Sequence, residues 1–220
     1  MYQCRRGLQG QVDGPTPPRR TPASIRPSSG GTSIGQKKCQ KKINQKFEME
    51  IRPTTIADLS AIETVHRQAF LSDLEASLVR LLISRRMGVI SLAAELKGSV
   101  VGHILFSPVA CETNEAVAAG LGLAPLAVLP EFQRRGIGSA LVRTGLDECQ
   151  RRAAPWVVVL GDPTYYGRFG FLPASQLGLS GEFGGDDAFQ ILLFTGEQAP
   201  SRGSHLRYAK EFGELVDGHG

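Results

Sequence analysis

Residues 126–141 read LAVLPEFQRRGIGSAL, which joins an apolar segment, a short loop with two glycines and the start of a helix. Glycine allows the backbone to adopt positive φ and to approach a ligand closely. The unpaired amides of a first helical turn, together with the helix dipole, attract anions, and Arg134 and Arg135 add positive charge beside them. The stretch therefore predicts a phosphate or pyrophosphate site on the amides of residues 134–140.

Two common phosphate loops match this stretch less well. A Walker loop ends in Gly-Lys-Ser/Thr, and the lysine is missing here. A dinucleotide fingerprint reads Gly-x-Gly-x-x-Gly, and the place of its third glycine holds Leu141. That fingerprint also follows the first strand of its domain, whereas this loop lies past the middle of the chain. The sequence therefore disfavours a P-loop nucleotide site and a dinucleotide site.

The segments around the loop alternate between strand and helix patterns. Strands are predicted at residues 47–52, 91–96, 100–109, 121–129, 156–160 and 189–194, and helices at 139–152 and 164–169 with two more beginning near Thr55 and Ser72. Hairpins come first and a strand–helix–strand unit follows. That order predicts one α/β domain with a mixed, mostly antiparallel central sheet flanked by helices.

Charge and hydrophobicity divide the chain near residue 46. The formal net charge is +4, but residues 1–46 contain ten basic residues and one acid, giving +9, which leaves −5 for residues 47–220. The first segment also has five prolines and few apolar residues, so we expect a disordered basic leader followed by a globular domain. Met49 begins Met-Glu-Ile-Arg-Pro within the first predicted strand, and we hypothesise that the biological start lies at or near it.

Several classes of function are disfavoured by composition. The acidic balance of residues 47–220 argues against nucleic acid as a partner. No apolar run approaches the roughly 18 residues that a membrane span needs, so no membrane partner is expected. The four cysteines show no Cys-x-x-Cys spacing and no cluster with histidine, which predicts no metal site and reduced thiols in a cytoplasmic protein.

The loop resembles the acetyl-CoA signature of the Gcn5-related N-acetyltransferase (GNAT) superfamily, Gln/Arg-x-x-Gly-x-Gly/Ala. Residues 133–138 match it at every fixed place, and Val128-Leu129-Pro130 stands where the family has Val-x-Pro. Residues 165–171 resemble a second family element, Tyr-x-x-x-Gly-Phe, which follows the next strand. Gly161-Asp162-Pro163 before it is similar to a bacterial branch of predicted N-acetyltransferases. The resemblance covers about residues 49–216.

The resemblance implies a GNAT-like fold and acetyl-CoA as the acyl-donor cosubstrate. The family's loop amides hold the CoA pyrophosphate, and its preceding strand offers backbone groups to the pantetheine arm. Carried over to this sequence, the cofactor-binding residues are Leu126, Ala127, Val128, Gln133, Arg134, Arg135, Gly136, Ile137, Gly138, Ser139 and Ala140. The implied activity is transfer of the acetyl group to a primary amine by direct attack in a ternary complex. The alternative is a degenerate module that binds acyl-CoA as a sensor or scaffold.

The resemblance also suggests catalytic residues. In its register Tyr166 is the family tyrosine, which would protonate the leaving CoA sulfur, with Tyr165 next in line. Both tyrosines could instead serve only to pack the core. Many relatives carry a carboxylate in the strand before the loop, but residues 121–125 supply none. His103 is therefore the first candidate for general base, ordered water is another route, and the further carboxylates are Glu95, Glu112 and Asp162.

The acceptor is a small-molecule or peptide amine, and its identity cannot be read from these motifs. The family resemblance is also compatible with a homodimer.

Overall fold

The computed structural model describes residues 49–112, 118–184, 186–194 and 199–217. The predicted basic leader, residues 1–46, lies outside the described residues. Among the described residues, no helix has both the length and the apolar character needed to cross a membrane.

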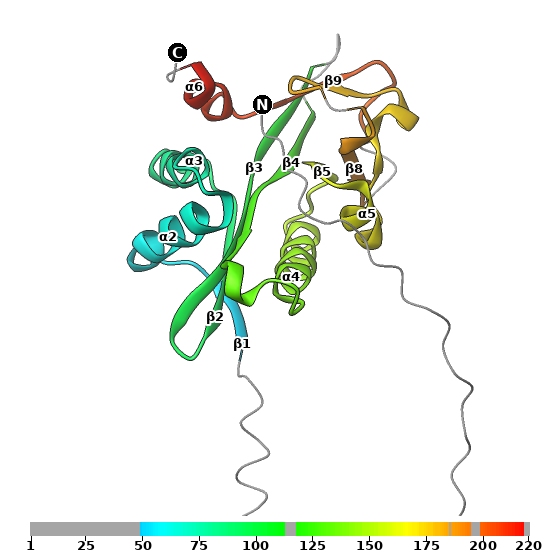
Figure 1. The fold of residues 1–220 in the computed structure, drawn as a ribbon. Helices are drawn as coiled ribbons and strands as arrows, with labels where there is room; N and C mark the ends of the chain where they lie inside the picture. The colour runs from blue at the N-terminus through cyan, green and yellow to red at the C-terminus, as the bar shows by residue number, and fades with distance from the viewer. Residues whose placement is uncertain (1–48, 113–117, 185, 195–198, 218–220) are drawn as a thin grey trace, which may run out of the picture. The chain divides into compact units, whose positions relative to one another are not determined.

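The described strands form one mixed sheet, seen in Figure 1. Its strands are β1 (Met49–Pro53), β2 (Ile90–Leu96), β3 (Ser99–Glu112), β4 (Ala118–Val128), β5 (Trp156–Leu160), β6 (Leu172–Pro173), β7 (Ser180–Gly181), β8 (Phe189–Leu193) and β9 (His205–Tyr208). The main order is β1-β2-β3-β4-β5-β8-β6, and β9 pairs with both β3 and β7. Only the β4–β5 and β7–β9 pairs are parallel. The predicted mixed, mostly antiparallel sheet is confirmed.

Helices cover both faces of this sheet. The helices are α2 (Leu59–Phe70), α3 (Leu74–Ser84), α4 (Ile137–Arg151), α5 (Pro163–Tyr166) and α6 (Glu211–Asp217). Figure 1 shows α2 and α3 on one side of β2–β4 and α4 on the other. Because successive residues of a strand point to opposite faces, Gly102 of β3 faces Leu141 of α4, while the next residue, His103, faces α2.

Each face has its own apolar core. Beneath α4, the ring of Phe106 lies against Gly145, where a Cβ atom would stand 2.4 Å from it. On the other face Trp156 is fully buried and lies against Gly120, where a Cβ would be only 2.2 Å from the indole. Both glycines are therefore required by close packing. The continuous apolar run of β5 serves both cores, as expected for a strand covered on two sides.

The structure differs from the sequence prediction in a few elements. Strand β3 continues to Glu112, three residues past the predicted end, because β9 pairs with residues 109–112. Neither β9 nor α6 was predicted, since four and seven residues are too short for periodicity to show clearly. The helix predicted at residues 164–169 is α5 followed by a 3-10 turn, Gly167–Phe169.

Candidate functional site

The centre of the site is the place where β4 and β5 separate. The two strands pair only at Leu121–Val157 and Gly122–Val158. Beyond that point β4 runs on to Val128 and stays paired on its other edge with residues 102–104 of β3. The register also shifts between Ile104 and Phe106, so β4 bulges at Ala124 and Pro125. Within the part of the chain that the structure describes, the edge of β4 that faces β5 therefore has no paired strand over residues 123–128.

The glycine loop follows directly from this open strand. The side-chain Nε2 of Gln133 donates to the carbonyl oxygen of Val128 at 2.9 Å, which fixes the loop to the end of β4. Gly136 caps α4 with φ of 83°, and Arg134 has φ of 59°. Left-handed residues alternating with ordinary ones turn successive amides to one side and form an anion-binding concavity. The sequence predicted the glycine but gave no sign that Arg134 is also left-handed.

The two arginines of the loop are exposed. The guanidinium of Arg135 lies 5.5 Å from the centre of the Phe132 ring. Within the described part of the chain neither Arg134 nor Arg135 forms an ion pair, whereas Arg151 and Arg152 are both bonded to Glu148. The positive charge at the loop is therefore available to an anion, in addition to the amides of the first turn of α4.

The two adjacent tyrosines are directed to different places. Asp162 caps α5 by accepting from the Thr164 amide at 2.8 Å. The hydroxyl of Tyr165 lies against Gly138 of the phosphate loop, 2.9 Å from where a Cβ would stand. Tyr166 packs its ring on Gly161 and lines a cavity beside β4. The structure thus separates the two candidates for general acid, with Tyr165 at the loop and Tyr166 at the cavity.

This cavity, of about 100 Å³, lies at the separation of β4 and β5. Strands β4 and β5 contribute Leu123, Ala124, Pro125, Leu126 and Leu160 to its lining, and Tyr166 of α5 adds to them. The other lining residues come from α2, α3 and later parts of the chain: Phe70, Glu75, Leu78, Phe183, Tyr208 and Phe212. Among all the predicted site residues, Leu126 and Tyr166 are brought together here.

His103 does not line this cavity. It is fully buried between β3 and α2, where its Nδ1 is 2.9 Å from Nε2 of His66 and its Nε2 is 2.9 Å from Oγ of Ser91. Burial, with a smaller effect of His66, lowers the pKa of His103 well below its usual range. Thr54 donates to Ser91 and ends the chain of hydrogen bonds at 2.6 Å. The structure places the first candidate base in the interior, although its backbone pairs with Ala127.

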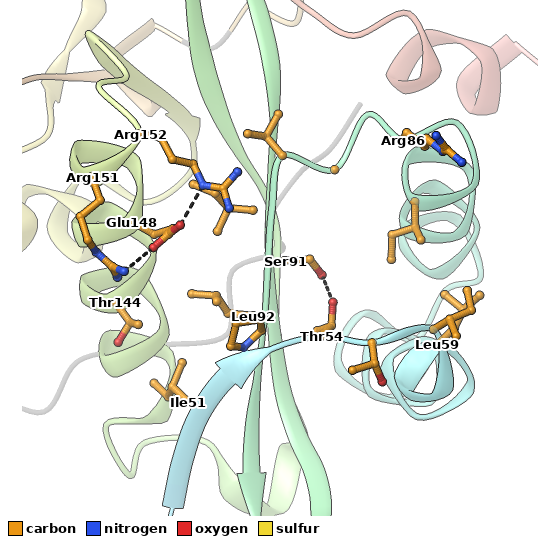
Figure 2. Close-up of a pocket in the computed structure, with 17 residues that line it drawn as sticks. Ile51, Thr54, Leu59, Arg86, Ser91, Leu92, Thr144, Glu148, Arg151 and Arg152 are labelled. Atoms are coloured by element: carbon orange, nitrogen blue, oxygen red, sulfur yellow. Dashed lines mark hydrogen bonds and ion pairs between the residues drawn. The ribbon is translucent and has the colours of Figure 1, made fainter.

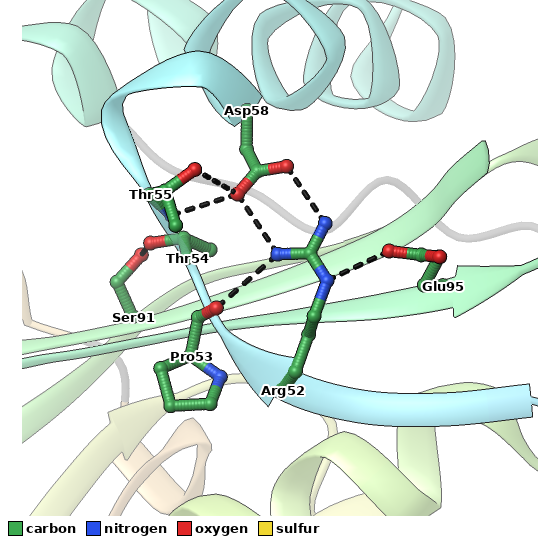
Figure 3. Close-up of polar contacts among 7 residues, drawn as sticks. All are labelled: Arg52, Pro53, Thr54, Thr55, Asp58, Ser91 and Glu95. Carbon is green, nitrogen blue, oxygen red and sulfur yellow. Dashed lines mark hydrogen bonds and ion pairs between the residues drawn. The ribbon is translucent and has the colours of Figure 1, made fainter. Parts of the chain in front are cut away.

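The other candidate carboxylates also have partners or lie apart from the cavity. Glu95 accepts from Arg52 at 2.7 Å, and Figure 3 shows the same guanidinium bound to Asp58. Asp58 also forms a capping box with Thr55 at the helix start predicted there, and these bonds hold the pKa of Asp58 well below its usual range, Arg52 being the largest cause. The hydroxyl and amide of Thr164 lower the pKa of Asp162. The side chain of Glu112 lies outside the described residues.

A larger cavity, of about 740 Å³, lies elsewhere on the domain and is shown in Figure 2. Residues of β1, β2 and α4 line it, together with the segment after α3. Its charged side chains include Glu148, which is bonded to Arg151 and Arg152 at 2.7 and 2.8 Å. None of the predicted site residues lines it. Size alone therefore does not make it the reactive site.

Of the twelve residues that line the cavity beside β4, only Leu126 and Tyr166 were predicted as site residues. Glu75 was missed, although the helix on which it lies was predicted to begin near Ser72, and Ser72 does accept from the Leu74 amide at 3.0 Å. Phe183, Tyr208 and Phe212 come from segments with no recognisable pattern. No local signal could have found them, because the fold brings Glu75 to three residues that lie more than 100 positions later in the chain.

A sequence profile of the acetyltransferase (GNAT) domain matches residues 50–174. The chain belongs to the GNAT family of acetyltransferases. The predicted resemblance is thereby confirmed. Two relatives from Escherichia coli K12 are similar in sequence. The uncharacterized N-acetyltransferase YjhQ is 39% identical over 124 residues, covering 56% of this chain and 68% of YjhQ. The uncharacterized N-acetyltransferase YhbS is 37% identical over 147 residues, covering 65% of this chain and 86% of YhbS.

Solved structures of GNAT proteins share the fold. The crystal structure of YhbS from Escherichia coli in complex with CoA aligns with a TM-score of 0.70 at 31% identity, over 76% of this chain and 93% of that one. A GNAT acetyltransferase from Brucella melitensis in complex with acetyl-CoA aligns with a TM-score of 0.64 at 33% identity, over 76% and 99%. This GNAT chain is thus an acyltransferase by family.

Proposed function

We propose that this GNAT chain transfers the acetyl group of acetyl-CoA to a primary amine by direct attack in a ternary complex. One observation carries the proposal: Leu126 and Tyr166 both line the cavity where β4 leaves β5, and β4 runs on into a loop whose backbone suits an anion. The CoA and acetyl-CoA complexes of the two structural relatives support this choice of cosubstrate.

The residues present fit acetyl-CoA. The pyrophosphate would sit on the amides of residues 136–140, with Arg134 and Arg135 beside it. The pantetheine arm carries two amides of its own and would pair with the open edge of β4 at residues 126–128, as an added strand does. Buried backbone polar groups need such partners. When bound, acetyl-CoA supplies the activated acetyl group.

The chain's own residues would then promote the transfer. Backbone amides at the open edge of β4 would donate to the thioester carbonyl oxygen, where negative charge develops as the amine attacks. Tyr166 would donate its proton to the sulfur as the C–S bond breaks. Tyr165, whose hydroxyl lies at Gly138, would act at the phosphate loop instead. The apolar wall of the cavity would exclude water, which would otherwise hydrolyse the thioester.

CoA binding and amine-dependent CoA release test the proposal together. CoA at 100 times its Kd should stabilise the fold by roughly 2.7 kcal/mol, a rise in Tm of about 5–10 °C for a domain of this size. With an accepted amine, Tyr166→Phe should lower kcat by about 10²–10⁴ and leave the CoA-induced Tm shift unchanged, while Tyr165→Phe serves as the neighbouring control. An unchanged kcat in Tyr166→Phe would refute the role of Tyr166 as general acid. The absence of a CoA-induced Tm shift would refute acetyl-CoA as the cosubstrate.

The setting of the reaction is part of the proposal. Cys111 and Cys149 are both buried free thiols, which suits a reducing compartment, and we place the protein in the cytoplasm. The acceptor is a small-molecule or peptide amine. A homodimer stays a prediction of the family resemblance, and sedimentation velocity tests it.

A further inference from the structure

Glu75 lines the largely apolar cavity and has one carboxylate oxygen without a partner among the described residues. Its Oε2 atom is buried and accepts no hydrogen bond from any described residue, and the rest of the cavity wall is aliphatic or aromatic. The neighbouring acids are different. Glu63 accepts from Arg80 at 2.6 Å, and Asp73 accepts from Arg67 at 2.6 Å. Of these three acids around α2 and α3, Glu75 is the one that faces the proposed reaction cavity.

Aromatic rings surround the space that Glu75 faces. The ring centres of Tyr208 and Phe212 are 4.9 Å apart, and Phe183 stands 5.8 Å from the first and 6.4 Å from the second. The hydroxyl of Tyr208 is buried with no hydrogen-bond partner among the described residues. Burial raises the pKa of Tyr208, so the hydroxyl stays neutral. A single carboxylate in an aromatic cavity favours a cation with an apolar body. The carboxylate pairs with the positive charge, and the aromatic rings pack on the apolar body.

We propose that this cavity is the acceptor site, that Glu75 binds the ammonium group of the acceptor and removes its proton, and that the acceptor class is a small apolar monoamine. The inference rests on the proposed acetyl transfer. Glu75, Tyr166 and Leu126 all line this one cavity. The amine held by Glu75 would therefore share the cavity with the thioester, and Tyr166 would be there to protonate the leaving sulfur.

The proton and electron balance is complete with these two side chains. An N–H bond of the ammonium breaks, its proton moves to the Glu75 carboxylate, and the electron pair stays on nitrogen. That pair forms the C–N bond to the carbonyl carbon as the C–S bond breaks and Tyr166 protonates the sulfur. The nitrogen loses a second proton, which restores Tyr166. Glu75 releases its proton to solvent, and the products are the amide and the CoA thiol.

The size of the cavity limits the acceptor further. A cavity of roughly 150 Å³ accepts benzene, so about 100 Å³ suits a short alkyl chain or a small ring. A carboxylate group on the acceptor would be repelled by the Glu75 carboxylate, which disfavours free amino acids as acceptors. An apolar body without further charges fills the aromatic walls best.

Binding measurements with matched ligands test the site without depending on turnover. Isoamylamine, isoamyl alcohol and leucine share one alkyl body but differ in charge. Calorimetry with and without saturating CoA should show the amine binding at least about tenfold more tightly than the alcohol and leucine, because charge-assisted bonds are the stronger ones. Glu75→Gln should remove this preference. Equal affinity for amine and alcohol, or no binding of the amine, overturns the proposal.

A neighbouring acid provides the control variant. Asp73 precedes α3 and points away to Arg67, so Asp73→Asn removes a charge from the same helix start and should leave amine affinity unchanged. Glu75→Gln should keep the CoA-induced Tm shift, which shows that it folds, and should lower kcat/KM for isoamylamine about a hundredfold. An unaltered amine affinity in Glu75→Gln overturns the site. Failure of the wild type to bind CoA would instead overturn the proposed function. The two failures can be told apart, because calorimetry also measures amine binding in the absence of CoA.

Discussion

Lowering the pH from 7 to 5 is expected to destabilise the domain through His66 and His103. Both rings are fully buried, and Nε2 of His66 is 2.9 Å from Nδ1 of His103. One of these two nitrogens must accept the shared proton, so the two rings cannot both be protonated without placing two N–H groups against each other. The Nδ1 of His66 is buried with no described partner. Burial lowers the pKa of His66 to about 3, and that of His103 also falls.

The size of the effect follows from linkage. A group whose pKa is lower in the folded state takes up a proton on unfolding, so its stabilising effect is complete above the unfolded pKa of roughly 6.5 and falls as the pH drops toward the folded pKa. Between pH 7 and pH 5, each histidine that stays neutral in the fold costs about 2 kcal/mol of unfolding free energy. The pair should together cost about 4 kcal/mol. Carboxylates contribute little, because they ordinarily titrate below about 4.5.

Urea unfolding at the two pH values measures this difference directly. The histidine ring ¹⁵N shifts of the folded protein provide a second measurement, which should show the rings of His66 and His103 neutral at pH 5. A His66→Leu/His103→Leu variant, if it folds, should lose most of the pH dependence. An unfolding free energy that changes by less than about 1 kcal/mol, or a His66 ring that titrates near 6.5, would refute the reasoning.

Two glycine substitutions separate cofactor binding from packing. Gly138→Ala would place a Cβ 2.9 Å from the hydroxyl of Tyr165, and we expect CoA affinity to fall at least about tenfold in calorimetry. Gly167→Ala, which meets open space, should bind CoA as the wild type does, and equal losses in the two variants would contradict the loop geometry. Gly120→Ala would drive a Cβ to 2.2 Å from the buried Trp156. Such overpacking costs about 1–3 kcal/mol or more, so Tm should fall by several degrees, and an unchanged Tm in a thermal melt would disprove the contact.

The fold and the phosphate loop could be predicted because their signals are local. The hairpin of β2 and β3, the continuous apolar run of β5 and the glycine loop before α4 are each recognisable from a short stretch of neighbouring residues. The helix start near Thr55 is equally local, and the structure has a capping box there between Thr55 and Asp58. Such patterns predict the secondary structure of a short segment, whatever that segment packs against in the fold.

The cavity could not be predicted because its parts are distant in sequence. Glu75 and Tyr208 are separated by most of the domain, and neither has a motif around it. His66 and His103 are 37 residues apart, and nothing in either segment shows that one ring meets the other. The choice between Tyr165 and Tyr166 depended on a helix of only four residues. A shift of one residue in that helix decides whether a side chain points to the loop or to the cavity.

The separation of β4 from β5 explains how these distant parts would belong to one site. A strand that leaves its neighbour exposes a row of peptide groups, and these need either water or an extended ligand with amides of its own. Pro125 has no N–H and lies in the bulge at the start of this open edge. The open edge of β4 therefore favours an extended cosubstrate along residues 126–128. At its Pro125 end, which has no N–H to donate, the edge suits an apolar group instead. The thioester would then reach the same cavity that Glu75 faces from α3, so one break in the sheet would accommodate both reactants.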